Sequence, residues 1–212
     1  MLNNSPFQIV IIDDDTRFTS KPLFEELVEL YGQENLIWKE TPQEGLAFLQ
    51  KNLTKRTIVI LDYHLGDRMP TGLSWLKPLQ EVSSLLYIIL NTSHEVSRIT
   101  PDELKDCINN HLMALVDKTD GYTKTLLEVE KAIGYLSNRV DCILEEWILR
   151  HEQFTREKPY IRNEKGETLN LNDILIEIRK DTEFGRKMSN NIISTAITLM
   201  QRDIDKLDNS KK

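Results

Sequence analysis

The sequence predicts an α/β protein whose main domain is a doubly wound, five-stranded parallel sheet. Short apolar runs alternate with amphipathic stretches through about the first 137 residues. This alternation is typical of parallel strands joined by right-handed helical crossovers, with helices on both faces of the sheet. Several of the runs end in Asp, Thr or Lys, and ligands of such sheets bind at the carboxyl ends of the strands.

Five runs have the length and composition of buried strands. They are FQIVII (7–12), NLIWK (35–39), TIVIL (57–61), LLYIIL (85–90) and LMALV (112–116). Amphipathic patterns between them predict helices at about 17–31, 42–51, 72–82 and 101–110. Thr41 and Thr100 are the expected caps of the second and fourth helices, because each directly precedes a proline, which suits the first turn of a helix.

A long amphipathic stretch follows the last expected strand. It predicts one helix from Tyr122 to about residue 150, since no proline occurs there before Pro159. Its apolar residues alternate by three and four, as in a coiled coil; beyond the sheet they form a seam of Leu136, Val140, Ile143 and Trp147. Two interpretations stay open for this seam. It binds the same helix of a second subunit in a homodimer, which we favour, or it packs on the C-terminal segment.

The remaining chain predicts a small α+β appendage. Residues 160–162 and 167–169 flank a turn-like sequence, Asn163 to Gly166, and predict a hairpin. A short helix capped by Asn170 or Asn172 and a last helix over about 182–207 follow. We therefore expect three segments: a domain at 1–137, a helical extension or coiled-coil linker at 138–157, and the hairpin with its helices at 158–212.

Composition excludes several classes of function. The 212 residues carry a net charge of −7. Residues 151–212 contain 12 Lys/Arg and 11 Asp/Glu, whereas residues 1–150 contain 15 Lys/Arg and 23 Asp/Glu. Binding to nucleic acid or to an anionic membrane needs a dense positive field, so neither is expected. The start has no export signal and no apolar run is long enough to span a membrane, so we expect a cytoplasmic protein. Cys107 and Cys142 lack metal-site spacing and are expected to be reduced thiols.

The ends of four expected strands carry polar residues that suit phosphoryl chemistry. They are Asp13-Asp14-Asp15, Asp62, Thr92 and Lys118. Adjacent carboxylates repel one another unless a cation lies among them, although a solvated turn would also explain three aspartates. A cluster of carboxylates binds Mg²⁺, a separate carboxylate acts as nucleophile, and a hydroxyl and an ammonium bind phosphoryl oxygens.

At these positions the chain resembles the receiver domain of two-component response regulators, over about residues 5–137. The resemblance rests on the acidic pair after the first strand, on Asp62 with LGDRMPTGL at 65–73, on Thr92 followed by Ser93, and on Lys118, in that order. It implies a flavodoxin-like receiver fold with the strand order 2-1-3-4-5.

The resemblance also implies roles for the residues of the site. Asp62 would accept the phosphoryl group. Asp14 would bind Mg²⁺ directly and Asp13 through water, with Asp62 and the backbone carbonyl of His64 completing the protein's metal ligands. Asp15 lies outside this pattern and is expected to be solvated.

Thr92 and Lys118 would bind the phosphoryl group, and His64 and His94 would tune its hydrolysis or be exposed loop residues. Two positions depart from the family: Thr119 follows the lysine where a proline is usual, and Leu115 stands where an aromatic residue often takes part in switching.

The expected function is therefore a response regulator, phosphorylated on Asp62 by a sensor histidine kinase or a phosphotransfer protein. It would signal through protein contacts or dimerisation to an output protein, and catalyse at most its own phosphorylation and dephosphorylation. A phosphate sink without output and a DNA-binding regulator are alternatives. A haloacid-dehalogenase-like phosphatase is disfavoured, because it requires Asp-x-Asp-x-Thr and Thr16 comes one place early.

Overall fold

The computed structural model describes residues 7–53, 55–66, 70–93, 99–110, 112–163 and 166–209, with side chains as far as residue 200. The chain forms two compact units, Met1–Cys142 and Ile143–Lys212. Each is described by itself. Within the described ranges, none of the helices has both the length and the apolar character that crossing a membrane requires.

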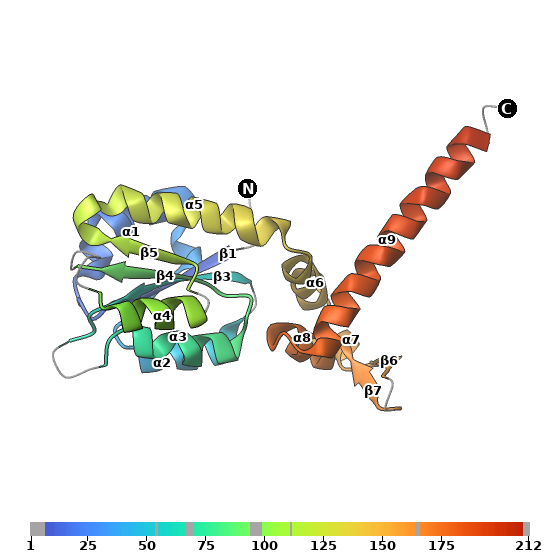
Figure 1. Cartoon of the computed structure of the whole chain (residues 1–212), viewed down its shortest axis with the longest axis horizontal. Helices are drawn as coiled ribbons and strands as arrows, with labels where there is room; N and C mark the ends of the chain where they lie inside the picture. The colour runs from blue at the N-terminus through green and yellow to red at the C-terminus, as the bar shows by residue number, and fades with distance from the viewer. Residues whose placement is uncertain are drawn as a thin grey trace. The chain divides into compact units, whose positions relative to one another are not determined.

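The first unit contains a five-stranded sheet in which every neighbouring pair is parallel. The strands are β1 (Phe7–Ile12), β2 (Leu36–Lys39), β3 (Arg56–Asp62), β4 (Tyr87–Thr92) and β5 (Ala114–Asp117). Their order is β2-β1-β3-β4-β5; Figure 1 labels β1, β3, β4 and β5 of this sheet. The predicted fold class and strand order are therefore confirmed.

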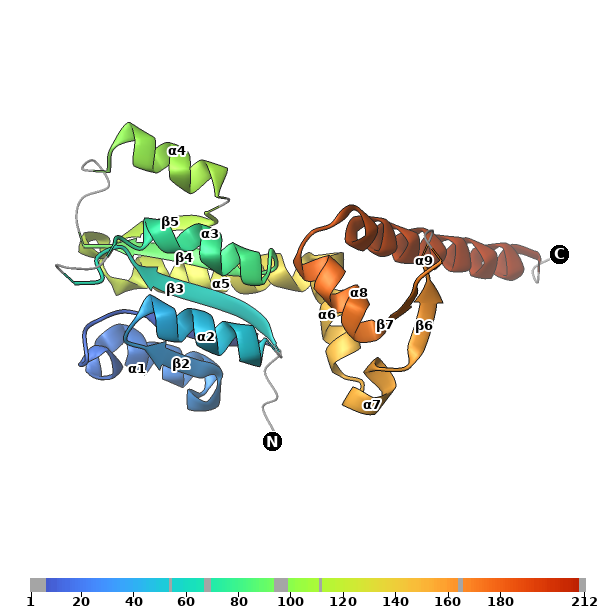
Figure 2. The same cartoon turned by 90° about the horizontal axis from the view of Figure 1, so that it is seen from below.

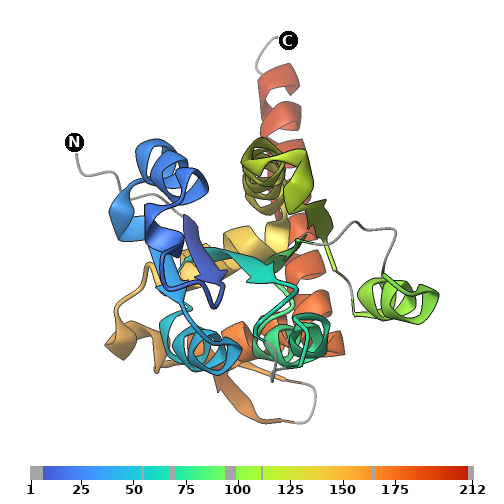
Figure 3. The same ribbon diagram turned by 90° about the vertical axis from the view of Figure 1, so that its left-hand side faces the viewer.

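Helices cover both faces of this sheet. They are α1 (Pro22–Tyr31), α2 (Pro42–Asn52), α3 (Leu73–Val82), α4 (Pro101–Asn109) and α5 (Tyr122–Asn138), with short 3-10 turns at Phe18–Ser20, Gln33–Asn35 and Lys118–Asp120. Helices α1 and α5 lie on one face and α2 and α3 on the other (Figure 3). Figure 2 agrees with Figure 3 that α4 stands beyond α3, at the outer edge of its layer.

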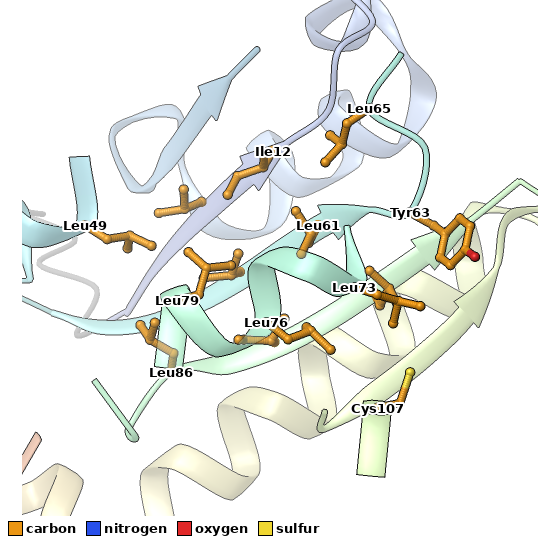
Figure 4. Close-up of a cluster of buried hydrophobic side chains, with 14 of the residues drawn as sticks. Ile12, Leu49, Leu61, Tyr63, Leu65, Leu73, Leu76, Leu79, Leu86 and Cys107 are labelled. Atoms are coloured by element: carbon orange, nitrogen blue, oxygen red, sulfur yellow. The ribbon is translucent and has the colours of Figure 1, made fainter. Parts of the chain in front are cut away.

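The core follows the alternation of side chains along the strands. Val10 and Ile12 of β1 point to the same side as Leu61 of β3 and pack with Leu76 and Leu79 of α3, as Figure 4 shows for most of the cluster. The other residues of these strands, such as Ile9, Ile11 and Ile60, are equally buried. Because both faces are covered, the strands read as continuous apolar runs rather than alternating ones.

Several expected elements differ in their bounds; β5, for example, begins at Ala114 and not at residue 112. The stretch predicted as one helix at 17–31 is a 3-10 turn followed by α1, because Lys21 precedes Pro22 and is extended (φ −86°, ψ 149°), as residues before proline tend to be. Strand β4 begins at Tyr87, two residues later than the apolar run, and ends at Thr92.

The prediction of a single helix from Tyr122 to residue 150 is wrong. Helix α5 ends at Asn138, Arg139 has an extended backbone (φ −81°, ψ 128°), and α6 (Val140–Leu149) follows. The Arg139 guanidinium pairs with the Asp141 carboxylate two positions later, with Nε to Oδ1 at 2.9 Å. Residues two apart do not face each other on a helix, so this pair requires the break.

The second unit holds the predicted hairpin and helices. After α6 come α7 (Gln153–Arg156), β6 (Pro159–Arg162), β7 (Thr168–Asn170), α8 (Leu171–Arg179) and α9 (Glu183–Asn209). Strands β6 and β7 pair antiparallel. Asn170 caps α8 through a capping box with Asp173, which settles the choice between Asn170 and Asn172. The buried Glu145 carboxylate accepts from Arg179 Nε at 2.7 Å and joins α6 to α8.

Candidate functional site

Four of the sequence-predicted residues lie at the carboxyl edge of the sheet. Asp13 follows β1, Asp62 is the last residue of β3, Thr92 is the last residue of β4, and Lys118 follows β5. Figure 3 views the first unit from this edge. The register of the parallel strands sets their mutual positions, with Thr92 opposite Asp117. The fold thus gathers residues that are far apart in the sequence.

The carboxylates of Asp13, Asp14 and Asp62 form a compact cluster. One oxygen of each lies within 4.8 Å of the others. Asp13 and Asp62 are buried, with 3% and 7% of their surface exposed, whereas Asp14 is exposed. The Trp38 indole donates to the Asp13 carbonyl at 3.0 Å and fixes the backbone there. Buried like charges repel, and hard oxygen ligands suit Mg²⁺, so this donor set fits a magnesium ion.

Lys118 supplies the positive charge next to this cluster. Its ammonium lies 2.9 Å from Asp62 Oδ2 and 3.1 Å from Asp13 Oδ2. Burial lowers the pKa of Lys118, but the neighbouring Asp62 and Asp13 carboxylates raise it by more, so the net shift is upward. Lys118 therefore remains a cation at neutral pH and bridges the two buried carboxylates.

The Asp62 carboxylate is held by partners on both oxygens. Besides Lys118 at Oδ2, the His64 backbone N–H donates to Oδ1 at 3.3 Å. Burial raises the pKa of Asp62 above its usual range; the Lys118 ammonium opposes this shift and the Asp13 charge adds to it. A buried carboxylate that is poorly compensated gains from a nearby divalent cation.

A second lysine, which the sequence analysis missed, borders the cluster. Lys21 Nζ lies 3.1 Å from Asp15 Oδ2 and 3.9 Å from Asp13 Oδ1. A backbone hydrogen bond from Arg17 and the side-chain contact with Lys21 lower the pKa of Asp15 to about 2. Asp15 is thus half-exposed and ion-paired, outside the carboxylate cluster. The only sequence signal for Lys21 is its position before Pro22, where the chain turns into α1.

Two glycines permit close approach at the site. The backbone of Gly66 has φ +88°, which favours glycine, and a Cβ there would lie 3.4 Å from Asp14 Oδ2. A Cβ on Gly72 would lie 2.3 Å from the Asp62 carbonyl oxygen. Gly72 also donates its N–H to the Tyr63 carbonyl at 2.8 Å. The start of α3 is therefore pressed against the backbone of Asp62.

The other predicted phosphoryl-binding and tuning residues are placed as follows. Thr92 is fully buried at the end of β4. His64 has an exposed side chain, and its ring meets the ring of Tyr63 edge to face, with centroids 4.9 Å apart. His94 lies outside the described residues.

The two departures from the receiver pattern have local structural counterparts. Thr119 donates both its N–H and its hydroxyl to Asp117 Oδ1, at 2.8 and 2.6 Å. These bonds close the turn that carries Lys118, where the family usually has proline. Leu115 is partly buried and packs against the core cluster.

The predicted dimer seam is not part of this site. Leu136 is buried in α5, whereas Val140, Ile143 and Trp147 belong to α6. Ile143 and Trp147, one helical turn apart, are 47% and 42% exposed. The break at Arg139 therefore divides the seam between two helices, and its role in a homodimer stays a prediction.

No protein-family model matches the sequence, and no curated protein matches it. Similar solved structures include a CheY-like response regulator receiver domain protein from Methanospirillum hungatei JF-1, which is 19% identical, covers 60% of this chain and 94% of its own, and has a TM-score of 0.49. The chemotaxis protein CheY4 of Vibrio cholerae is 16% identical over 59% of this chain and 97% of its own, with a TM-score of 0.46. A response regulator from Colwellia psychrerythraea is 24% identical, covers 60% of this chain and 98% of its own, and has a TM-score of 0.45.

Proposed function

We propose that the first unit is the receiver domain of a response regulator and that Asp62 accepts a phosphoryl group from a histidine kinase or a phosphotransfer protein. The observation that carries this proposal is the setting of Asp62. Its buried carboxylate lies 2.9 Å from the Lys118 ammonium and shares a cluster with the Asp13 and Asp14 carboxylates. A nucleophile, a cation and a set of hard metal ligands are thus close together.

In the proposed reaction, a carboxylate oxygen of Asp62 attacks the phosphorus of a phosphohistidine. The bond between phosphorus and the imidazole nitrogen breaks, its electron pair stays on the nitrogen, and an acyl phosphate forms on Asp62. Attack by water on phosphorus later returns the carboxylate and releases inorganic phosphate. The chain would act on no other substrate, so it would catalyse only its own phosphorylation and dephosphorylation.

The residues around Asp62 have separate tasks in this proposal. Asp13, Asp14, Asp62 and the His64 backbone carbonyl would hold Mg²⁺, which supplies charge neutralisation between the carboxylates and the incoming phosphoryl group. Lys118, already within hydrogen-bond distance of Asp62, would bind a phosphoryl oxygen. The buried Thr92 hydroxyl would bind another.

The test is to incubate the full chain with Mg²⁺ and a small phosphodonor such as acetyl phosphate. Intact mass spectrometry should find one added phosphoryl group that is lost in base, as an acyl phosphate is. Asp62→Asn should abolish the addition, and Asp102→Asn, which changes an exposed carboxylate of α4, should not. Phosphate accepted by Asp62→Asn at the wild-type rate would contradict the assignment.

The output of this switch is proposed to be a protein contact. The second unit has a nearly balanced charge from residue 151 onward, with 12 Lys/Arg against 11 Asp/Glu, and so lacks the positive field that DNA binding requires. Mobility-shift assays with genomic fragments at physiological salt, with and without beryllofluoride, test this point. Saturable nanomolar binding that depends on residues 158–212 would favour the DNA-binding alternative.

A further inference from the structure

Tyr63, the residue after Asp62, has hydrogen bonds at both its backbone N–H and its carbonyl, and its side chain lies in the core. The Tyr63 N–H donates to the Asn91 carbonyl of β4 at 2.7 Å, and its carbonyl accepts from Gly72 at the start of α3. Tyr63 is 8% exposed and belongs to the core cluster that also contains Leu61 and Leu73; Figure 4 shows its ring at one end of that cluster. Tyr63 thus connects the backbone beside Asp62 to the core through a buried aromatic ring.

The hydroxyl of Tyr63 reaches across to α4. It donates to Glu103 Oε1 at 2.6 Å. The other oxygen of this carboxylate accepts from the Thr100 N–H and from the Thr100 hydroxyl, both at 2.8 Å. Glu103 thus has two roles. It is the N3 residue of the capping box at the start of α4, and it accepts the hydrogen bond from Tyr63.

Both partners keep the protonation state that this bond needs. Burial, and then the hydrogen bond to Glu103, raise the pKa of Tyr63 to about 12. The hydrogen bond from Tyr63 lowers the pKa of Glu103. A phenol that donates to a carboxylate forms a short, charge-assisted bond, which is stronger than a neutral one.

Helix α4 buries little of its own side-chain surface in the part of the chain that the structure describes. Cys107 is its one buried side chain, whereas Ile108 is 75% exposed and Leu104 is also exposed. The helix stands at the outer edge of its layer (Figure 2). The hydrogen bond from Tyr63 to Glu103 is thus one of the contacts that fix its first turn, together with the capping box.

We infer that Tyr63 is a positioning residue that couples the state of Asp62 to the position of the first turn of α4, through its hydroxyl and Glu103. The inference rests on the proposed function. The contacts form a continuous chain: Asp62 Oδ1 accepts from the His64 N–H, the His64 ring meets the Tyr63 ring, and the Tyr63 hydroxyl binds the cap of α4.

A phosphoryl group on Asp62 removes the charge from one carboxylate oxygen and draws the Lys118 ammonium toward the new oxygens. The hydrogen bond from His64 then changes, and the backbone at 62–64 adjusts with it. When the Tyr63 hydroxyl leaves Glu103, the cap of α4 loses a partner, and the first turn of the helix opens more often. The two-state element that the acceptor biases is thus the start of α4.

The experiment compares wild type with Tyr63→Phe in the full chain, by hydrogen exchange of the α4 amides with and without Mg²⁺ and beryllofluoride. Losing a charge-assisted hydrogen bond shifts a local opening equilibrium by about tenfold, so activation should speed exchange at the first turn of wild type by about that factor. In Tyr63→Phe, exchange should be fast already at rest and unchanged by activation. Tyr87→Phe, which alters another buried tyrosine, on β4, should behave as wild type.

Glu103→Ala provides a second route to the same answer if Tyr63→Phe disturbs the core. Because Glu103→Ala also removes the capping box of α4, exchange at the first turn should be faster than in Tyr63→Phe. It should not respond to activation, and adding Tyr63→Phe to Glu103→Ala should change nothing further, because the hydrogen bond between the two residues is already gone. A wild type that accepts phosphate on Asp62 but shows no change at α4, or a Tyr63→Phe variant that keeps the full change, overturns the coupling. If the mass spectrum shows no phosphate on wild-type Asp62, the proposed function itself is contradicted, and the inference that rests on it fails as well.

Discussion

The Lys118 ammonium lies 2.9 Å from Oδ2 of Asp62 and also bridges to Asp13 at 3.1 Å. Lys118→Met removes the cation that would bind the transferred phosphoryl group, so the rate of acceptance from acetyl phosphate should fall by about 100-fold. Mg²⁺ should still bind, and more tightly, because a competing positive charge is gone. Lys131→Met on the exposed surface of α5 is the matched control. A Lys118→Met rate equal to wild type would refute this role.

Binding of Mg²⁺ should be visible through Trp38, whose indole donates to the Asp13 carbonyl. We expect titration with Mg²⁺ to change the tryptophan emission of wild type, and Trp38→Phe to remove the change. Asp14→Ala should also abolish it, since the exposed Asp14 carboxylate is a proposed ligand. Asp15→Ala should leave it intact, because Asp15 pairs with Lys21 outside the cluster. Equal responses in both aspartate variants would argue against this ligand set.

Asp62→Asn should stabilise the metal-free protein at neutral pH. Burial raises the pKa of Asp62 above its usual 3.8, so the folded protein holds the Asp62 proton more tightly than the unfolded chain does. The stability that this provides is fully present below pH 3.8 and is lost as the pH rises through the folded-state pKa. Asn has no charge to lose. Melting temperatures in EDTA should therefore be higher for the variant at pH 7 and should converge with wild type below pH of about 4. Adding Mg²⁺ should stabilise wild type alone; a variant that melts lower at pH 7 contradicts the argument.

Gly72→Ala should disturb both folding and acceptance. The new Cβ would lie 2.3 Å from the Asp62 carbonyl oxygen, and a clash with backbone costs about 1–3 kcal/mol of unfolding free energy. Gly134→Ala in α5 is the control, because a Cβ there has nothing within 4 Å and alanine favours the helix by up to about 1 kcal/mol. Denaturant titration and phosphorylation rates measure both effects. Equal stabilities for the two variants would contradict the close approach of α3 to Asp62.

The sequence was sufficient to predict the main elements of the first unit and the residues at its carboxyl edge. The strands are buried on both faces, so each appears as an apolar run, and Asp13, Asp62 and Lys118 mark where three of these runs stop. The predicted bounds of strand β4 lie two residues too early. Leu85 and Leu86 are buried although they precede the strand, and the polar Asn91 and Thr92 are buried inside it. Apolar character reports burial and not extended backbone.

The features that were missed depend on contacts that no local pattern encodes. Arg139 and Asp141 are ordinary residues on a helix surface, and their pairing across a break leaves no proline or glycine signal. Lys21 reaches the site only because a 3-10 turn precedes α1. Tyr63 and Glu103 are 40 residues apart, and their bond follows from where the core places one ring.

The homodimer through the seam of Leu136, Val140, Ile143 and Trp147 stays a prediction, and the exposed residues of that seam lie on α6. Ile143 and Trp147 are exposed one turn apart, so Ile143→Lys should leave the monomer stable but place a charge in the interface. Light scattering at high micromolar concentration should show a dimer for wild type and a monomer for the variant. Ile108→Lys, at an exposed position of α4, is the control. A monomeric wild type under these conditions would end the proposal.

The break at Arg139 sets how force can pass along the chain. A continuous α-helix is a stiff rod that carries a twist from one end to the other through its ladder of hydrogen bonds. The extended residue between α5 and α6 interrupts that ladder, so backbone hydrogen bonds do not carry a twist from one helix to the other. The Arg139 side chain instead pairs with Asp141 and lies over the Tyr135 ring at this break. Because salt weakens a partly exposed ion pair, the contact that Arg139 makes with Asp141 at this break should weaken as the ionic strength of the surrounding solution rises.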